Sequence, residues 1–126
     1  MKKALLEKHL LSLNGAEKYY PFGPDPSVFK VMDKMFAFIS ANKDVPLVTV
    51  KCVPLDGEML AEQFEAISPG YHMNKKHWIT ISLTEEVPDD MLIDLINKSY
   101  ELVVSKLTKA NRAKLEHQSS AQNRAK

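Results

Sequence analysis

The chain has 126 residues, and 17 basic residues against 16 acidic ones leave a formal net charge of +1. This length fits one domain, which buries roughly two thirds of its unfolded surface without needing disulfides or metals. The single cysteine, Cys52, excludes an internal disulfide. Because the total charge is near zero, any binding of nucleic acid must come from local clusters of charge.

The amino-terminal segment briefly resembles a secretory signal. Glu7, Lys8 and His9 interrupt its apolar run, and no small-residue cleavage site follows. No stretch approaches the roughly 20 apolar residues that span a bilayer. We therefore expect a cytoplasmic protein without membrane contact, whose oligomeric state stays open.

The first half of the chain predicts a helix followed by strands. Residues 3–13 form an apolar stripe at helical spacing, and Asn14-Gly15 ends the helix. Residues 17–22 predict a short strand before a proline-rich loop. Residues 28–39 predict a hairpin that turns near Met32-Asp33-Lys34, and residues 47–52 another strand. One face of this hairpin carries Phe29, Val31, Phe36 and Phe38; the opposite face carries Lys30, Met35, Ala37 and Ile39.

The second half predicts helix, hairpin and a long helix. Residues 56–67 form an apolar stripe of Met59, Leu60, Phe64 and Ile67. Residues 71–83 predict a hairpin around Asn74-Lys75-Lys76, with Ile79, Ile81 and Leu83 opposite Trp78, Thr80 and Ser82. The longest helix spans about Pro88 to Leu107, with a buried seam of Leu92, Ile96, Ser99, Val103 and Leu107. A short basic helix from Lys109 to about His117 and a disordered tail, residues 118–126, complete the chain.

These elements predict an α+β fold, in which helices pack on one face of an antiparallel sheet and leave the other face partly open. We expect a single domain over residues 1–117. The predicted core contains eleven residues: Phe29, Val31, Phe36, Phe38, Val48, Val50, Ile79, Ile81, Leu92, Ile96 and Val103.

The most informative stretch for function is residues 69–78, which carries two lysines, two histidines, a tyrosine and a tryptophan. If Ile79 and Ile81 face the core, Trp78 faces out of the sheet, where it can stack on a base while lysines meet phosphate. On pattern alone, a partly buried Trp78 beside solvated lysines is favoured over this hypothesis. The open face should also carry Lys30, Thr49, Lys51 and Thr80.

Other candidate sites are weaker. The basic residues from Lys106 onward are more typical of a solvated end than of a binding surface. His72 and His77 are too few ligands for a closed metal site. Cys52 suits a small core residue better than a nucleophile. Phosphate loops and nucleophile elbows are absent from the sequence. We therefore expect no cofactor and no enzymatic activity.

The sequence resembles the MmcQ/YjbR family from the first helix to about residue 112. The matching pieces are Tyr20-Pro21-Phe22-Gly23-Pro24, Val28-Phe29-Lys30-Val31, Lys34-Met35-Phe36-Ala37, Val50-Lys51-Cys52, residues 69–78 and Ser99-Tyr100-Glu101-Leu102-Val103. The specific part is Tyr71-His72-Met73-Asn74-Lys75 with His77-Trp78. One departure is the Met32-Asp33 turn, where a glycine is expected.

This resemblance implies a frataxin-like, double-wing fold and a DNA-binding function assigned by structural analogy. We expect binding that is largely independent of sequence. The residues expected to bind nucleic acid are Lys30, Lys51, Tyr71, His72, Asn74, Lys75, Lys76, His77 and Trp78.

Two other functions stay open. A protein-interaction adaptor would use Met35, Ile39 and Trp78 on the open face as apolar anchors. Metal handling, by analogy with frataxin, is less favoured because the first helix carries one acid, Glu7, against Lys2, Lys3 and Lys8. DNA and a protein partner are therefore both candidate partners.

Overall fold

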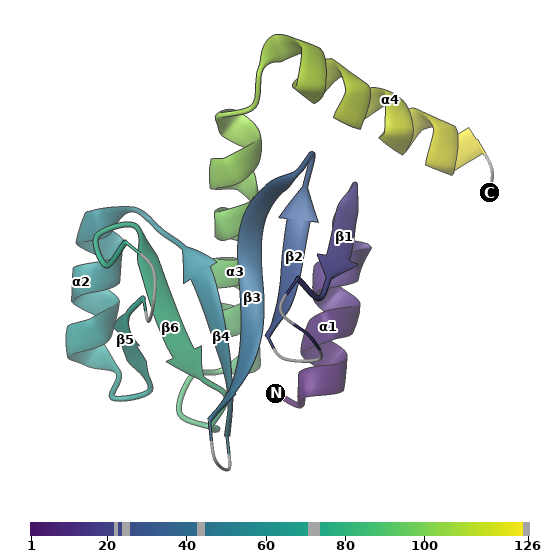
Figure 1. Ribbon diagram of the computed structural model, residues 1–126. Helices are drawn as coiled ribbons and strands as arrows, with labels where there is room; N and C mark the ends of the chain where they lie inside the picture. The colour runs from purple at the N-terminus through teal and green to yellow at the C-terminus, as the bar shows by residue number, and fades with distance from the viewer. Residues whose placement is uncertain (22, 24–25, 43–44, 71–73, 125–126) are drawn as a thin grey trace.

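The computed structural model describes residues 1–21, 23, 26–42, 45–70 and 74–124. Its centre is a six-stranded antiparallel sheet with the strand order β1-β2-β3-β4-β6-β5 (Figure 1). The strands are β1 (Ala16–Tyr19), β2 (Ser27–Val31), β3 (Lys34–Asn42), β4 (Val45–Lys51), β5 (Ile67–Pro69) and β6 (Trp78–Ser82).

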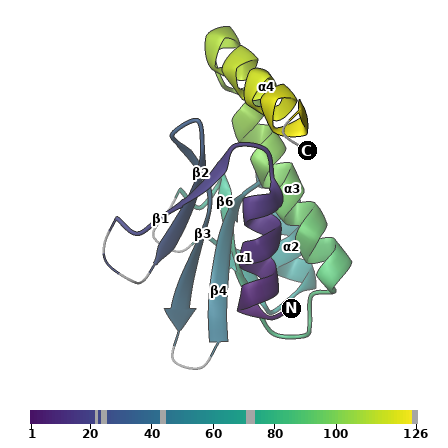
Figure 2. The same ribbon diagram turned by 90° about the vertical axis from the view of Figure 1, so that its right-hand side faces the viewer.

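Helices cover one face of this sheet, as Figure 2 shows from the side. They are α1 (Lys3–Ser12), α2 (Pro54–Gln63) and α3 (Asp89–Ser105). A fourth helix, α4 (Lys109–Arg124), lies across one end of the sheet. The predicted α+β architecture, with helices on one face of an antiparallel sheet, is confirmed.

Helix α3 is the main covering element, and it ends at Ser105, slightly before the predicted end near Leu107. The predicted seam is confirmed, since Leu92, Ile96, Ser99 and Val103 of α3 are buried, as is Leu107 just beyond the helix. The Ser99 hydroxyl donates a hydrogen bond to the backbone carbonyl of Phe36 (2.6 Å) and accepts one from the backbone N–H of Lys51 (2.8 Å). This one polar side chain therefore ties α3 to both β3 and β4.

A β-bulge in β3 changes which residues reach the core. The register passes from Phe29 opposite Ala37 to Lys30 opposite Met35, so Phe36 is the extra residue. The bulge breaks the strict alternation that the sequence prediction assumed. Ala37 and Ile39 are buried in the core, whereas Phe38 is only half-buried opposite Thr49. Placing Phe38 in the core, and Ala37 and Ile39 opposite it, was therefore wrong; the other ten predicted core residues are buried.

The β2–β3 turn adopts a left-handed backbone without glycine. Met32 has φ +48° and Asp33 has φ +64°. Positive φ at both central residues is the geometry of a two-residue type I′ hairpin. The missing glycine therefore leaves the hairpin in place, although a β-branched residue at either position would be strained.

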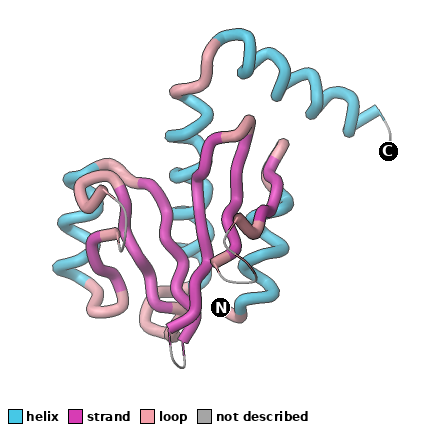
Figure 3. Tube along the Cα trace, in the orientation of Figure 1, coloured by secondary structure: helices cyan, strands magenta, loops and turns pink. Residues whose placement is uncertain are grey.

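Helix α2 is shorter than predicted because its chain continues into a strand. The helix ends at Gln63, and Ile67–Pro69 form β5 against β6 (Figure 3). Ile67 is buried as a strand residue, and Met59, predicted to lie in the buried stripe, is 60% exposed. The residue that α2 buries is Gly57, where an added Cβ would lie 2.9 Å from the Cys52 Sγ atom.

Helix α4 extends to Arg124, beyond the end near His117 that the sequence predicted. Residues 118–124, for which disorder was expected, are helical here. Leu115 anchors the helix, since it is buried and its backbone carbonyl accepts a hydrogen bond from the Asn14 side chain (3.0 Å).

The two phenylalanines of β3 provide a test of the bulge. We expect Phe36→Ala to lower the free energy of unfolding by about 3–5 kcal/mol, because a fully buried ring leaves a cavity. Phe38→Ala should cost clearly less, since Phe38 is half-buried on the other face. Urea titrations of both variants measure the difference. Equal losses would show that both rings lie in the core, which contradicts a bulge at Phe36.

Candidate nucleic-acid interface

Residues 74–77, which lead into β6, form a turn that Asn74 organises. Its side-chain oxygen accepts a hydrogen bond from the Lys76 backbone N–H (3.0 Å). Its backbone carbonyl accepts hydrogen bonds from the backbone N–H groups of His77 and Trp78 (both 3.1 Å). The side chains of Lys75, Lys76 and His77 are exposed. Asn74 therefore shapes the turn that presents these three side chains.

Trp78 does not project into solvent. Its exposed fraction is 9%, and the backbone of Gly70 passes so close that an added Cβ would lie 2.5 Å from the Trp78 Cβ atom. The projecting tryptophan of the base-stacking hypothesis is therefore wrong, and the covered indole agrees with the buried Trp78 that the sequence pattern favoured. An indole that is already covered by protein does not offer a face for stacking on a base.

The sheet face opposite the helices is less open than predicted. Thr49 and Thr80, expected as solvated residues, are buried, and their hydroxyls lie 2.9 Å apart in a hydrogen bond. Ile39, an expected apolar anchor for a protein partner, is 1% exposed because the bulge turns it to the core. With Trp78 also covered, this face lacks two of the three anchors that the adaptor hypothesis needs.

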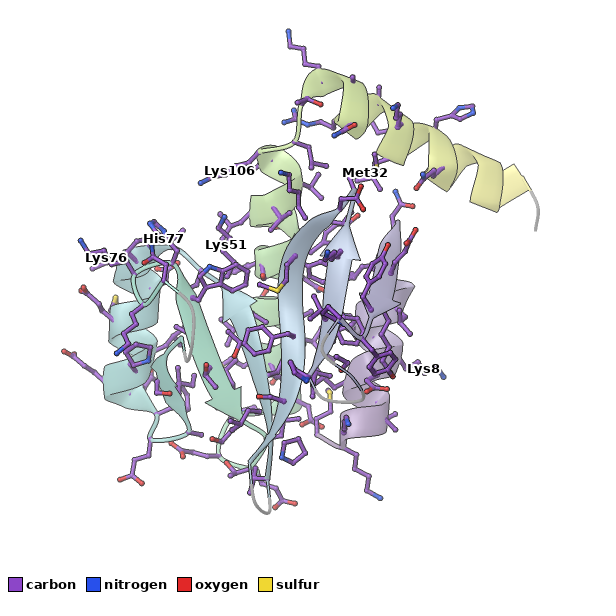
Figure 4. All side chains as sticks on the ribbon, viewed as in Figure 1. Lys8, Met32, Lys51, Lys76, His77 and Lys106 are labelled. Atoms are coloured by element: carbon purple, nitrogen blue, oxygen red, sulfur yellow. The ribbon has the colours of Figure 1, made fainter. Side chains whose placement is uncertain are left out.

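Cationic side chains from three elements gather at one end of the sheet. Figure 4 shows Lys51 at the end of β4, Lys106 at the end of α3, and Lys76 and His77 beside them. A backbone hydrogen bond from the Cys52 N–H to the His77 carbonyl (2.9 Å) joins the β4 end to the turn. We call Lys51, Lys75, Lys76, His77 and Lys106 the cationic edge.

Within the described part of the chain, the lysines of the cationic edge form no ion pair with a carboxylate. The ion pairs found among the described residues use the amino terminus, Lys18 and Lys98, and none uses a lysine of this edge. Burial lowers the pKa of the Lys51 ammonium, and the nearby charge of Lys106 lowers it further. An anion bound beside these two like charges would relieve their repulsion.

The basic start of α4 continues this edge. The Arg112 guanidinium donates a hydrogen bond to the Ser105 carbonyl at the end of α3 (2.8 Å). Arg112 and the neighbouring Lys109 are exposed. The C-terminal basic run, which the sequence favoured as a solvated end, thus starts on this edge at Lys106 and continues through Lys109 and Arg112.

The structure brings together four of the nine predicted binding residues: Lys51, Lys75, Lys76 and His77. Lys30 lies apart on β2, with its ammonium 5.2 Å from the centre of the Tyr19 ring. Tyr71 and His72 lie outside the described residues, and Asn74 is used by the turn. Lys106 was missed as a site residue, because no sequence spacing relates it to Lys51.

Cys52 is a free cysteine, and its side chain is buried. Burial raises the pKa of the Cys52 thiol, and the Asp56 carboxylate raises it further, against the opposite effect of the Gly57 N–H. In the part of the chain that the structure describes, no three His, Cys, Asp or Glu residues cluster as a metal site. No helix of the described residues is long and apolar enough to cross a membrane.

Comparisons with known proteins define the class. The YjbR family model matches residues 11–102. The uncharacterised protein YbdF of Escherichia coli O157:H7 is 40% identical over 105 residues, covering 83% of this chain and 86% of that protein. The uncharacterised protein YjbR of Escherichia coli K12 is 30% identical over 107 residues, covering 85% of this chain and 91% of the relative.

Solved structures share the fold. The crystal structure of a Deinococcus radiodurans protein with domain DUF419 has a TM-score of 0.81 at 37% identity, covering 88% of this chain and 85% of that one. A Pseudomonas syringae protein has a TM-score of 0.72 at 27% identity, covering 81% and 98%. The fold is therefore that of a bacterial family of small α+β proteins. This chain belongs to the MmcQ/YjbR family.

Trp78 is the single tryptophan, so its fluorescence reports directly on the covered position. We expect blue-shifted emission and weak quenching by acrylamide in the native protein, because 9% exposure keeps water and quencher away. Unfolding in urea should shift the emission to the red and restore quenching. Native emission resembling that of the unfolded chain would place the indole in solvent.

Ser99 also makes a testable contribution. Ser99→Ala leaves the Phe36 carbonyl and the Lys51 N–H without this partner, and each such group costs about 1–3 kcal/mol. Ser105→Ala is the matched control, because that exposed hydroxyl bonds only to the Leu102 carbonyl of its own helix. Denaturation midpoints measure both. A loss for Ser99→Ala no larger than the control's would contradict the bridging role.

Proposed function

We propose that this protein binds nucleic acid without catalysing a reaction, and that the cationic edge meets the phosphate backbone. The observation that carries the proposal is the gathering of Lys51, Lys76 and Lys106 from three separate elements, without a carboxylate partner among the described residues. Lysines that neutralise phosphates release counterions, which supplies affinity without reading sequence.

Because Trp78 is covered by protein, base stacking on its indole is not part of the proposed binding mode. Base stacking on this residue would require the indole to leave its place beside Gly70. The proposal therefore rests on phosphate contacts, and binding should be largely independent of sequence. DNA is the proposed ligand, and DNA binding should not quench Trp78.

The absence of catalysis is part of the same proposal. The only cysteine is buried and its raised pKa keeps the thiol neutral, which disfavours a nucleophilic role. A cytoplasmic location, where DNA and reduced thiols occur together, fits this function.

Salt dependence tests the cationic edge directly. We expect Lys76→Gln/Lys106→Gln to weaken binding of a fluorescein-labelled DNA duplex and to reduce the slope of log affinity against log salt by about 1.8, for two lost phosphate contacts. Anisotropy titrations at several salt concentrations measure this slope.

A matched double variant tests whether DNA binding depends on the lysines of the cationic edge or only on the net charge of the chain. Lys3→Gln/Lys8→Gln removes the same charge from exposed positions of α1, and Lys8 lies far from the edge in Figure 4. This control should leave the slope nearly unchanged. Equal effects of both double variants, or an affinity that does not respond to salt, would remove the cationic edge as the binding site.

A further inference from the structure

A groove separates α2 from α3 on the helical side of the sheet. Its volume is about 500 Å³, and Lys51 and Cys52 line it where β4 ends. The walls are rich in flexible apolar side chains: Met59, Leu60, Met91, Leu95 and Leu102. Methionine side chains adapt to irregular apolar partners, which is typical of surfaces that accept helices.

Helix α2 leaves apolar side chains in solvent for a structural reason. It buries Gly57 against Cys52 and Ile79, so its backbone lies too close to the sheet for a larger residue at that position. Met59 and Leu55 are consequently 60% and 64% exposed, and Val53 at the start of the helix is 46% exposed. Large apolar side chains grouped in this way mark an interaction surface.

Acidic residues frame the groove. Three carboxylates, those of Asp56, Asp94 and Glu101, line it against two lysines, Lys51 and Lys98, and Lys98 pairs with Asp94 (3.2 Å). Asp56 and Glu101 line the groove from opposite helices and are exposed. The charged side chains that line the groove therefore sum to −1, whereas the net charge of the chain is +1.

We propose that this groove binds an amphipathic, basic helix of a partner protein. Apolar side chains at positions i, i+3 or i+4, and i+7 of the partner would lie between Leu60 and Leu102. Its lysines and arginines would reach the carboxylates on both rims, which favours a basic helix over an acidic one and speeds association.

This surface differs from the cationic edge in position and in charge. The groove is apolar with acidic rims, and the edge is basic; they meet only at Lys51. Nucleic acid and the partner helix can therefore be tested separately. Met59→Gln should leave DNA binding unchanged, and Lys76→Gln/Lys106→Gln should leave helix binding unchanged.

The probe is a fluorescein-labelled peptide of about 14 leucine and lysine residues at helical spacing, which spans roughly 21 Å as a helix. We expect it to bind the full chain, to become helical by circular dichroism, and to shift backbone NMR signals of α2 and α3. A peptide with glutamate in place of every lysine has the same leucine pattern and should bind at least about tenfold more weakly.

Matched variants locate the site. Met59→Gln should weaken peptide binding by roughly fivefold to tenfold, whereas Leu5→Gln, at a similarly exposed leucine of α1, should change it less than about twofold. Asp56→Asn/Glu101→Gln should weaken binding at low salt, and Glu85→Gln/Glu116→Gln, which removes the same charge elsewhere, should not.

Three results would overturn the proposal: equal binding of the lysine and glutamate peptides, an affinity indifferent to Met59→Gln, or NMR shifts that map away from α2 and α3. A fourth is a dimer of the chain that forms without peptide and is lost in Met59→Gln. This dimer would assign the groove to a second copy. Unchanged circular dichroism of each variant ensures that a loss of binding is not a loss of fold.

Discussion

The Ser99 hydroxyl is the contact on which the arrangement of this protein depends. It bonds the Phe36 carbonyl at the bulge of β3 and the Lys51 N–H at the end of β4, so one helix is fixed to two strands. A buried hydroxyl with both its donor and acceptor used specifies one register of helix on sheet. Because α3 is held in this register, its last turn carries Lys106 to the side of Lys51 (Figure 4).

The near-zero net charge conceals a division of charge across the molecule. Basic residues gather where β4, α3 and the β5–β6 turn meet, and acidic residues follow α2 and α3. Local fields of this kind act within about 10 Å at moderate salt, so the total charge of +1 says little about either surface. The two proposed partners, an anionic backbone at one surface and a basic helix at the other, therefore carry opposite charge.

Family membership and the structure agree on the fold, but neither of them defines which ligand the surface binds. The same fold can carry different sites, so side chains decide what a member binds. In this chain some residues of the 69–78 stretch stabilise the fold, and others present charged side chains at the surface. The indole is covered beside Gly70, and Asn74 organises the turn, while Lys75, Lys76 and His77 remain exposed.

The sequence by itself determined the helices and strands whose apolar spacing is regular. The seam of α3 and the alternation of β4 and β6 follow from periods of 3.6 and 2 residues, and both were predicted. Only the tertiary structure decided the position of Phe38, because one bulged residue inverts the faces that follow it. It also decided that α2 ends early, that Trp78 is covered, and that Lys106 joins Lys51. These features depend on contacts between residues far apart in the chain, and local periodicity carries no information about such contacts.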